Sequence, residues 1–173
     1  VQPNMEGAGL LALAGGLLLS VTGLAPELQG WVLMLGGGII AMRILRWQPW
    51  QYRSRLDIVL LFAGYAGLAL AVFLLGLDEF SLTARLLSTH AVTVAAMGVL
   101  MVTIMARVSV VKKFKDAGAL KSSYLASCLL VLAASTRLLA PLFPAVYLPL
   151  LHSAMLCWSL GFAVLLFVLW RCR

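Results

Sequence analysis

The segment RLLSTHAVTVAAMGVLMVTIMAR, residues 85–107, decides the fold class of this chain. Between Arg85 and Arg107 lie 21 residues without a charged side chain. An α-helix rises about 1.5 Å per residue, so this run is long enough to cross a bilayer core of roughly 30 Å. We therefore predict a membrane-spanning helix over residues 85–106.

The composition of the whole chain extends this prediction. Of its 173 residues, 63% are hydrophobic and 11% are charged, and the mean hydropathy is +1.04. A soluble globule of this length needs more polar side chains to cover its surface. The sequence thus predicts an all-α, polytopic membrane protein with the lipid bilayer as its first partner. Nucleic acid is not expected despite the net charge of +7, because the basic residues lie between apolar runs instead of clustering on one amphipathic face.

Six apolar runs are visible, and we predict that they form one compact bundle covering residues 1–173. Every connection between them is short, so no domain outside the membrane is expected. The expected spans are residues 7–24, 30–45, 57–77, 85–106, 120–140 and 145–170.

The basic residues predict the orientation of this bundle. Eleven of the 13 basic residues fall beside two alternate connections or in the C-terminal tail, which places them on one face. Basic connections stay in the cytoplasm, so we predict that both termini are cytoplasmic. The residues counted are Arg43, Arg46, Arg53, Arg55, Arg107, Lys112, Lys113, Lys115, Lys121, Arg171 and Arg173.

Four strongly polar side chains are expected at a similar depth near the opposite face: Arg85, His90, Arg137 and His152. Helical rise places His90 about 8 Å and His152 roughly 10 Å below the boundary. Imidazoles ligate haem iron or copper, and arginines hold carboxylates such as haem propionates. The alternative is that the histidines bond to neighbouring carbonyls and the arginines reach the headgroups.

A stripe of sulfur side chains follows His90 along the same predicted helix. At helical spacing, His90 is followed by Val94, Met97, Met101 and Met105. Such a stripe is either a soft surface for copper or haem, with His90 and Met97 as metal ligands, or a helix interface with adaptable side chains. Met155, on the last helix, is a second thioether at a comparable depth.

Other chemistries find no support in the sequence. The six carboxylates lie near helix ends or in connections, so a proton relay inside the membrane is not expected. Neither a phosphate-binding glycine loop nor a zinc-protease motif is present, and the residues assign no catalysed reaction. Cys128, Cys157 and Cys172 have no metal-binding spacing and are expected to be free thiols.

Several short segments together resemble the NnrS family. They are His90–Gly98 and Met105–Ser109 in the fourth expected helix, Gly64–Tyr65 in the third, Arg137–Pro141 in the fifth and Trp158–Phe162 in the sixth. The resemblance spans about residues 40 to 170. It covers only the C-terminal half of the family's members, which have about twelve spans. Residues 110–115 stand where the family has Gly-His-Thr-Gly, and Phe62 stands where a histidine often precedes the Gly-Tyr pair.

The resemblance implies a function as well as a fold. NnrS proteins are multi-pass proteins of the bacterial inner membrane, described as containing haem and copper and linked to nitric oxide protection. For this chain it implies a haem or copper centre with His90 as ligand, acting in nitric oxide response or respiratory electron transfer. The alternative is a cofactor-free accessory subunit of a larger respiratory complex. In both cases other membrane subunits or further copies of the chain are expected as partners.

Overall fold

The computed structural model describes residues 3–23, 25–82, 85–116 and 118–173, and every regular element in them is helical. The predicted all-α class is therefore confirmed. In order, the elements are α1 (Pro3–Thr22), α2 (Pro26–Arg46), the 3₁₀ turn η1 (Pro49–Tyr52), α3 (Leu56–Glu79), α4 (Arg85–His90), the π-helix η2 (Ala91–Gly98), α5 (Val99–Phe114), α6 (Lys121–Leu139), the 3₁₀ turns η3 (Ala140–Leu142) and η4 (Pro144–Val146), and α7 (Tyr147–Arg171).

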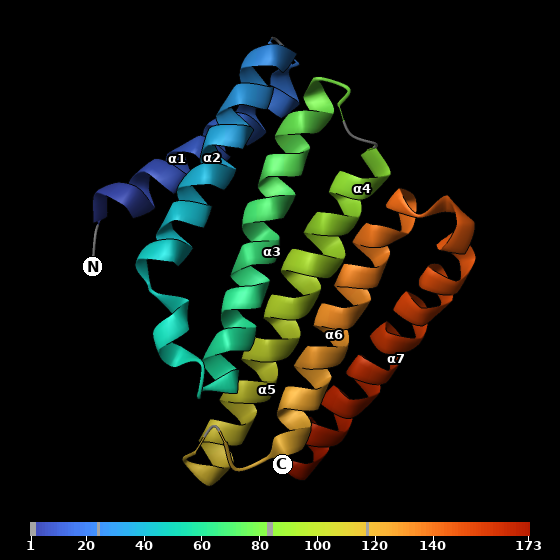
Figure 1. The fold of residues 1–173 in the computed structure, drawn as a ribbon. Coiled ribbons are helices and arrows are strands. Elements are labelled where there is room, and N and C mark those ends of the chain that lie inside the picture. The colour runs from blue at the N-terminus through green and yellow to red at the C-terminus, as the bar shows by residue number, and fades with distance from the viewer. Residues whose placement is uncertain (1–2, 24, 83–84, 117) are drawn as a thin grey trace.

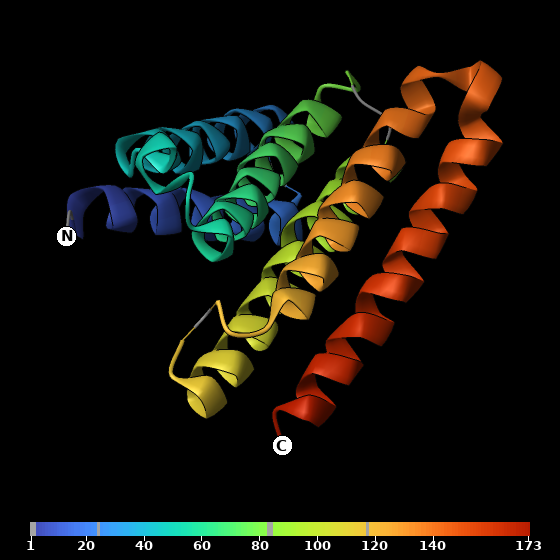
Figure 2. The same cartoon turned by 60° about the horizontal axis from the view of Figure 1, so that its bottom comes forward.

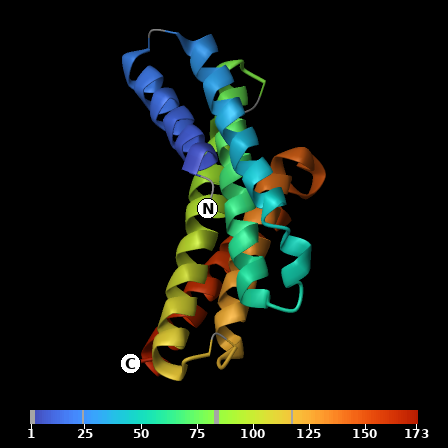
Figure 3. The same ribbon diagram turned by 90° about the vertical axis from the view of Figure 1, so that its left-hand side faces the viewer.

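Five helical segments of the described chain are long and apolar enough to cross a membrane. They are Pro26–Arg46, Leu56–Glu79, Arg85–Phe114, Lys121–Leu142 and Pro144–Arg171. The first expected span forms a shorter apolar helix, Gly7–Thr22. In Figures 1 and 3, α1 runs back obliquely from its connection with α2, so the N-terminus lies nearer mid-height than the C-terminus. A multi-pass fold is thus established, whereas the count of six crossings and the side of each terminus remain predictions.

Helix α3 occupies the centre of the bundle. Figures 1 and 2 show α1 and α2 on one side of it and the α4–η2–α5 segment, α6 and α7 on the other. The connections α1–α2, α3–α4 and α6–α7 lie at one end. The connections α2–α3 and α5–α6 and the C-terminus lie at the other end, which carries most of the basic residues. We call this second end the basic end.

Glycines allow α3 to approach its neighbours closely. A Cβ on Gly76 would lie 2.7 Å from the carbonyl oxygen of Gly30 in α2, and one on Gly67 would lie 2.4 Å from that of Ala95 in η2. Small residues let membrane helices pack backbone against backbone, which replaces the hydrophobic driving force that lipid removes. The contact at Gly67 sets η2 against α3, and the contact at Gly76 sets α2 against it.

The largest buried cluster joins η2 and α5 to α6 and α7. Its members are mainly alanine and valine, including Val102, Val110, Ala126 and Val168, all completely buried, together with Leu130. Gly161 in α7 faces Leu130, whose Cδ2 atom would lie 2.0 Å from an added Cβ. The small side chains therefore allow the second half of α7 to pack closely against α6.

The fourth expected helix is longer and less regular than predicted. It continues to Phe114 instead of ending at residue 106, so Arg107, Lys112 and Lys113 lie within α5 and not in a connection. Between His90 and Val99 it takes the π form, in which each turn holds roughly one residue more than an α turn.

The π segment overturns the single stripe expected after His90. Seven residues bring an α-helix back to the same face, but the wider turns of η2 do not. His90 and Val94 face the interior side of the bundle, while Met97, Met101 and Met105 are 63%, 49% and 42% exposed. The methionines therefore form an outward-facing surface instead of continuing the face of His90.

Candidate functional site

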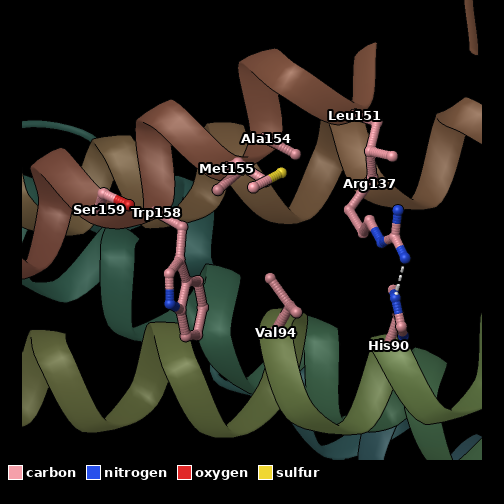
Figure 4. Close-up of a pocket in the computed structure, with 9 residues that line it drawn as sticks. His90, Val94, Arg137, Leu151, Ala154, Met155, Trp158 and Ser159 are labelled. Carbon is pink, nitrogen blue, oxygen red and sulfur yellow. Dashed lines mark hydrogen bonds between the residues drawn. The ribbon is translucent and has the colours of Figure 1, made fainter. Parts of the chain in front are cut away.

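The main candidate site is a cleft between the α4–η2 segment and α7, which we call the His90 cleft. Its volume is about 390 Å³, within the range of small-molecule sites. Helix α6 packs against both η2 and α7 and forms the third wall. Figure 4 shows the side chains from these elements facing one another. The lining residues are His90, Val94, Ala133, Arg137, Leu151, Ala154, Met155, Trp158 and Ser159.

Two of the polar side chains predicted from the sequence meet in this cleft. The Nη2 atom of Arg137, in α6, is hydrogen-bonded to Nε2 of His90, in α4 (Figure 4). A guanidinium group has donors only, so Nε2 must accept and the ring hydrogen must lie on Nδ1. That Nδ1 atom is buried and has no hydrogen-bond partner among the described residues. The imidazole is thus held in one tautomer with an unused donor.

Arg137 carries a charge that its surroundings do not balance. It is half-buried near the end of a membrane-spanning helix, and its hydrogen-bond partner is the ring of His90. Arg55 and Arg107 are ion-paired with Asp57, whereas Arg137 takes part in no ion pair within the described residues. A membrane-embedded cation usually has a carboxylate or another strong acceptor beside it. The cleft therefore offers a position for a negative group.

The other predicted site residues lie outside the cleft. Arg85 begins α4 and is exposed, and His152 is exposed on α7 although its neighbour Leu151 lines the cleft. Met97 is turned outward by the π segment. Of the two thioethers considered for copper, Met155 lines the cleft and Met97 does not.

Trp158 and Gly98 close one end of the cleft, a contact that the sequence analysis did not foresee. The indole packs on Gly98, where an added Cβ would lie 2.6 Å from two of its ring carbons. Trp158 also packs against Phe162, with ring centroids 5.0 Å apart. Both ends of this contact lie in segments that carried the family resemblance, but the sequence did not indicate that they touch.

The chain offers few metal ligands in one place. No group of three or more histidine, cysteine or acidic side chains is close enough to hold a metal ion within the described residues. The three cysteines are free, as expected. The His90 cleft supplies one imidazole, one thioether and one guanidinium. His90 and Arg137 would be the residues to hold a haem, and copper would need further ligands from outside this cleft.

A second polar cluster lies toward the basic end, where α3, α5 and α6 meet. Asp57 is 4% exposed, and its oxygens lie 3.3 Å from Nε of Arg55 and 3.3 Å from Nε of Arg107. The hydrogen bond to Asp57 and the charge of that carboxylate raise the pKa of Arg55 above its ordinary value. A cavity of only about 10 Å³ is enclosed here by residues from all three helices. We call this the Asp57 cluster, and its lining comprises Asp57, Leu60, Thr103, Ala106, Arg107, Ser123, Tyr124 and Ser127.

The sequence did not indicate the Asp57 cluster, for a specific reason. Asp57 is the second residue of α3, and acids at helix ends usually face solvent. Arg107 was counted with the connections as a basic residue that sets the orientation. One signal was available: 21 uncharged residues precede Arg107, and the helix continues beyond this residue to Phe114. A charged side chain inside such a helix needs a partner.

Comparison with known proteins identifies a family. A family model described as NnrS protein matches residues 1–172. The match covers nearly the whole chain. From the sequence we expected a likeness over residues 40–170, to the C-terminal half of the family's members only, and this expectation was too narrow. No curated protein and no solved structure matches the chain.

Proposed function

The chain belongs to the NnrS family, and on that premise we propose that it acts in the nitric oxide response by binding haem or copper in the His90 cleft. The proposed location is the bacterial inner membrane. The observation that carries the proposal is the convergence of His90 and Arg137 in a cleft of about 390 Å³. Uncompensated polar groups at membrane depth are costly and are usually kept for a function.

Each cleft residue has a proposed task that follows from its chemistry. The imidazole of His90 would ligate the metal, and the guanidinium of Arg137 would pair with an acidic substituent of a bound haem. The thioether of Met155 suits copper(I). The bound metal would supply a centre for binding nitric oxide or passing electrons. Arg85, His152 and Met97 lie outside the cleft, so within one chain the proposal depends on His90 and Arg137.

The direct test is the cofactor content of the purified protein. Wild-type protein isolated with its native partners is expected to contain iron or copper, and a haem would give visible absorbance. His90→Ala should insert into the membrane but lose the cofactor or shift its spectrum. His152→Ala is the matched control, because it removes the other histidine of the sequence from an exposed position outside the cleft. Wild-type protein without iron, copper and visible absorbance contradicts the proposal.

A second candidate function is a cofactor-free accessory subunit of a larger respiratory complex. It is favoured by a groove on α2 and α3 of about 470 Å³, lined by apolar residues and glycines. Gly38 borders the groove, and a Cβ added there would have no heavy atom within 4 Å. Membrane helices use such small-residue surfaces to pack against helices of other chains. Isolation of a stable, metal-free hetero-oligomer in mild detergent would support this function over the first.

A further inference from the structure

We infer that the ligand of the His90 cleft carries an acidic group, and that Arg137 must leave His90 to bind it, which frees His90 for a metal. The inference rests on the proposed function, in which Arg137 pairs with an acidic substituent of the ligand, and adds that Arg137 changes partner when the ligand binds. It assigns Arg137 a positioning role: by binding the acidic group of the ligand, Arg137 releases His90 to bind the metal.

Neither ring nitrogen of His90 is available to bind a metal while Arg137 is in place. The Nε2 lone pair is engaged by Arg137, and Nδ1 carries the ring hydrogen and is buried. A neutral imidazole ligates a metal only through a nitrogen lone pair. In the arrangement of Figure 4, His90 therefore has no lone pair to offer. Arg137 has to be displaced before His90 can ligate anything.

A carboxylate on the ligand would displace Arg137 from His90. A carboxylate offers two oxygens to the guanidinium fork, whereas His90 offers one neutral nitrogen. In the described part of the chain no acidic side chain is ion-paired with Arg137. An incoming carboxylate therefore gives Arg137 the better partner. Because the charge sits on a long, rotatable side chain, the exchange needs no helix movement.

The remainder of the cleft favours an apolar body for the ligand. Away from Arg137 the cleft is lined by Val94, Met155 and Trp158, which favour an apolar body. A free copper ion has no acidic group and is repelled by the nearby guanidinium until that group is displaced. The cleft thus favours a metal complex with an acidic substituent over the bare ion. A phospholipid phosphate shares the acidic chemistry and is the natural competitor within a membrane.

The experiment compares ferric protoporphyrin IX, which has two propionates, with its dimethyl ester, which has none. Both are titrated by visible absorbance into purified wild-type protein in phosphatidylcholine nanodiscs. We expect the acid to bind roughly tenfold more tightly than the ester, the size of one charge-assisted hydrogen bond. In Arg137→Gln this preference should disappear. The ester should bind this variant at least as tightly as it binds wild type, because the Nε2 lone pair of His90 is then no longer held by a guanidinium.

Two variants and one lipid separate the explanations. Arg85→Gln removes an arginine from outside the cleft and should keep the preference for the acid. His90→Ala should lose the spectral shift with both compounds. Adding phosphatidylglycerol to the nanodiscs should weaken binding of the acid and not of the ester if lipid phosphate competes for Arg137.

The outcomes distinguish this inference from the proposed function. If both compounds bind through His90 with equal affinity in wild type, the inference is overturned and the proposed function stands. A uniform loss of affinity for both compounds in Arg137→Gln likewise overturns it. If wild type binds neither compound, haem binding in the proposed function fails as well. The wild-type comparison needs no variant, so a poorly folding Arg137→Gln protein leaves the test intact.

Discussion

The His90 cleft and the Asp57 cluster place an arginine beside a buried polar group at two levels of the same bundle. Both involve the segment Arg85–Phe114, with His90 near one end and Arg107 near the other. At the Asp57 cluster a carboxylate balances the arginines, and the cavity holds about 10 Å³. At the cleft the partner is a neutral imidazole and the volume is about 390 Å³.

The difference teaches how to separate structure from function among polar groups inside a membrane protein. A buried charge with its counter-charge and little free space has its interactions satisfied within the fold. A buried charge without one, next to free volume, leaves an interaction for a ligand to complete. By this criterion the Asp57 cluster ties α3 to α5, while the His90 cleft is the candidate binding site.

The largest effect is expected in a test of whether the two regions face opposite sides of the membrane. After Cys128, Cys157 and Cys172 are replaced by serine, single cysteines at Glu79 and Lys113 should label from opposite sides. Membrane-impermeant reagent added outside intact cells should react with Glu79→Cys and not with Lys113→Cys. Labelling of Lys113→Cys from outside contradicts the predicted orientation. The Asp57 cluster would then lie toward the outside and the His90 cleft toward the cytoplasm.

Removal of the acid from the Asp57 cluster should cause the largest change in stability. Asp57→Ala leaves Arg107 without its partner, and we expect a loss of roughly 2–4 kcal/mol, below the full value for a buried pair because Arg107 is partly exposed. The measurement is thermal unfolding in detergent. Arg137→Gln, measured without ligand, should cost less than about 1 kcal/mol, because no counter-charge is stranded and glutamine still donates. Equal losses in the two variants would remove the distinction drawn above.

Filling the contact at the end of the cleft should have an intermediate effect. Gly98→Ala places a methyl group where the Trp158 ring now lies, so we expect a loss of roughly 1–3 kcal/mol and altered ligand affinity. Gly38→Ala is the matched control, since it adds the same atom in open space and should gain up to about 1 kcal/mol. Unchanged stability and binding in Gly98→Ala would mean that Trp158 does not define the cleft.

The smallest effect is expected inside the Asp57 cluster. The hydroxyl of Thr103 is buried without a partner among the described residues, so Thr103→Val should change stability by less than about 1 kcal/mol, in the stabilising direction. Thr103→Ser keeps the hydroxyl and serves as the control. A clear destabilisation by valine alone would show that a water molecule in the small cavity completes the cluster, which would sharpen the contrast with the open cleft.

Much of the fold could be predicted from local pattern. Each of the six expected apolar runs corresponds to a helix, because hydrophobic length and the cost of unpaired backbone groups in lipid act on each segment separately. Where the helices approach most closely follows from tertiary contact: a Cβ added to Gly37 or Gly67 would lie within 3 Å of backbone atoms of a neighbouring helix. The π form of residues 91–98 was not predicted, and it is the feature that separates His90 from the methionines.

The sequence alone determined the membrane class, the helical segments, the family resemblance and His90 and Arg137 as candidates, because these follow from composition and local order. It named Arg85, His152 and Met97 as candidates beside them, since depth along a helix says nothing about the direction of a side chain. Only the tertiary structure decided that His90 and Arg137 meet and that Asp57 pairs with Arg107. Those pairings depend on the rotation of each helix about its axis, which close contacts between helices fix.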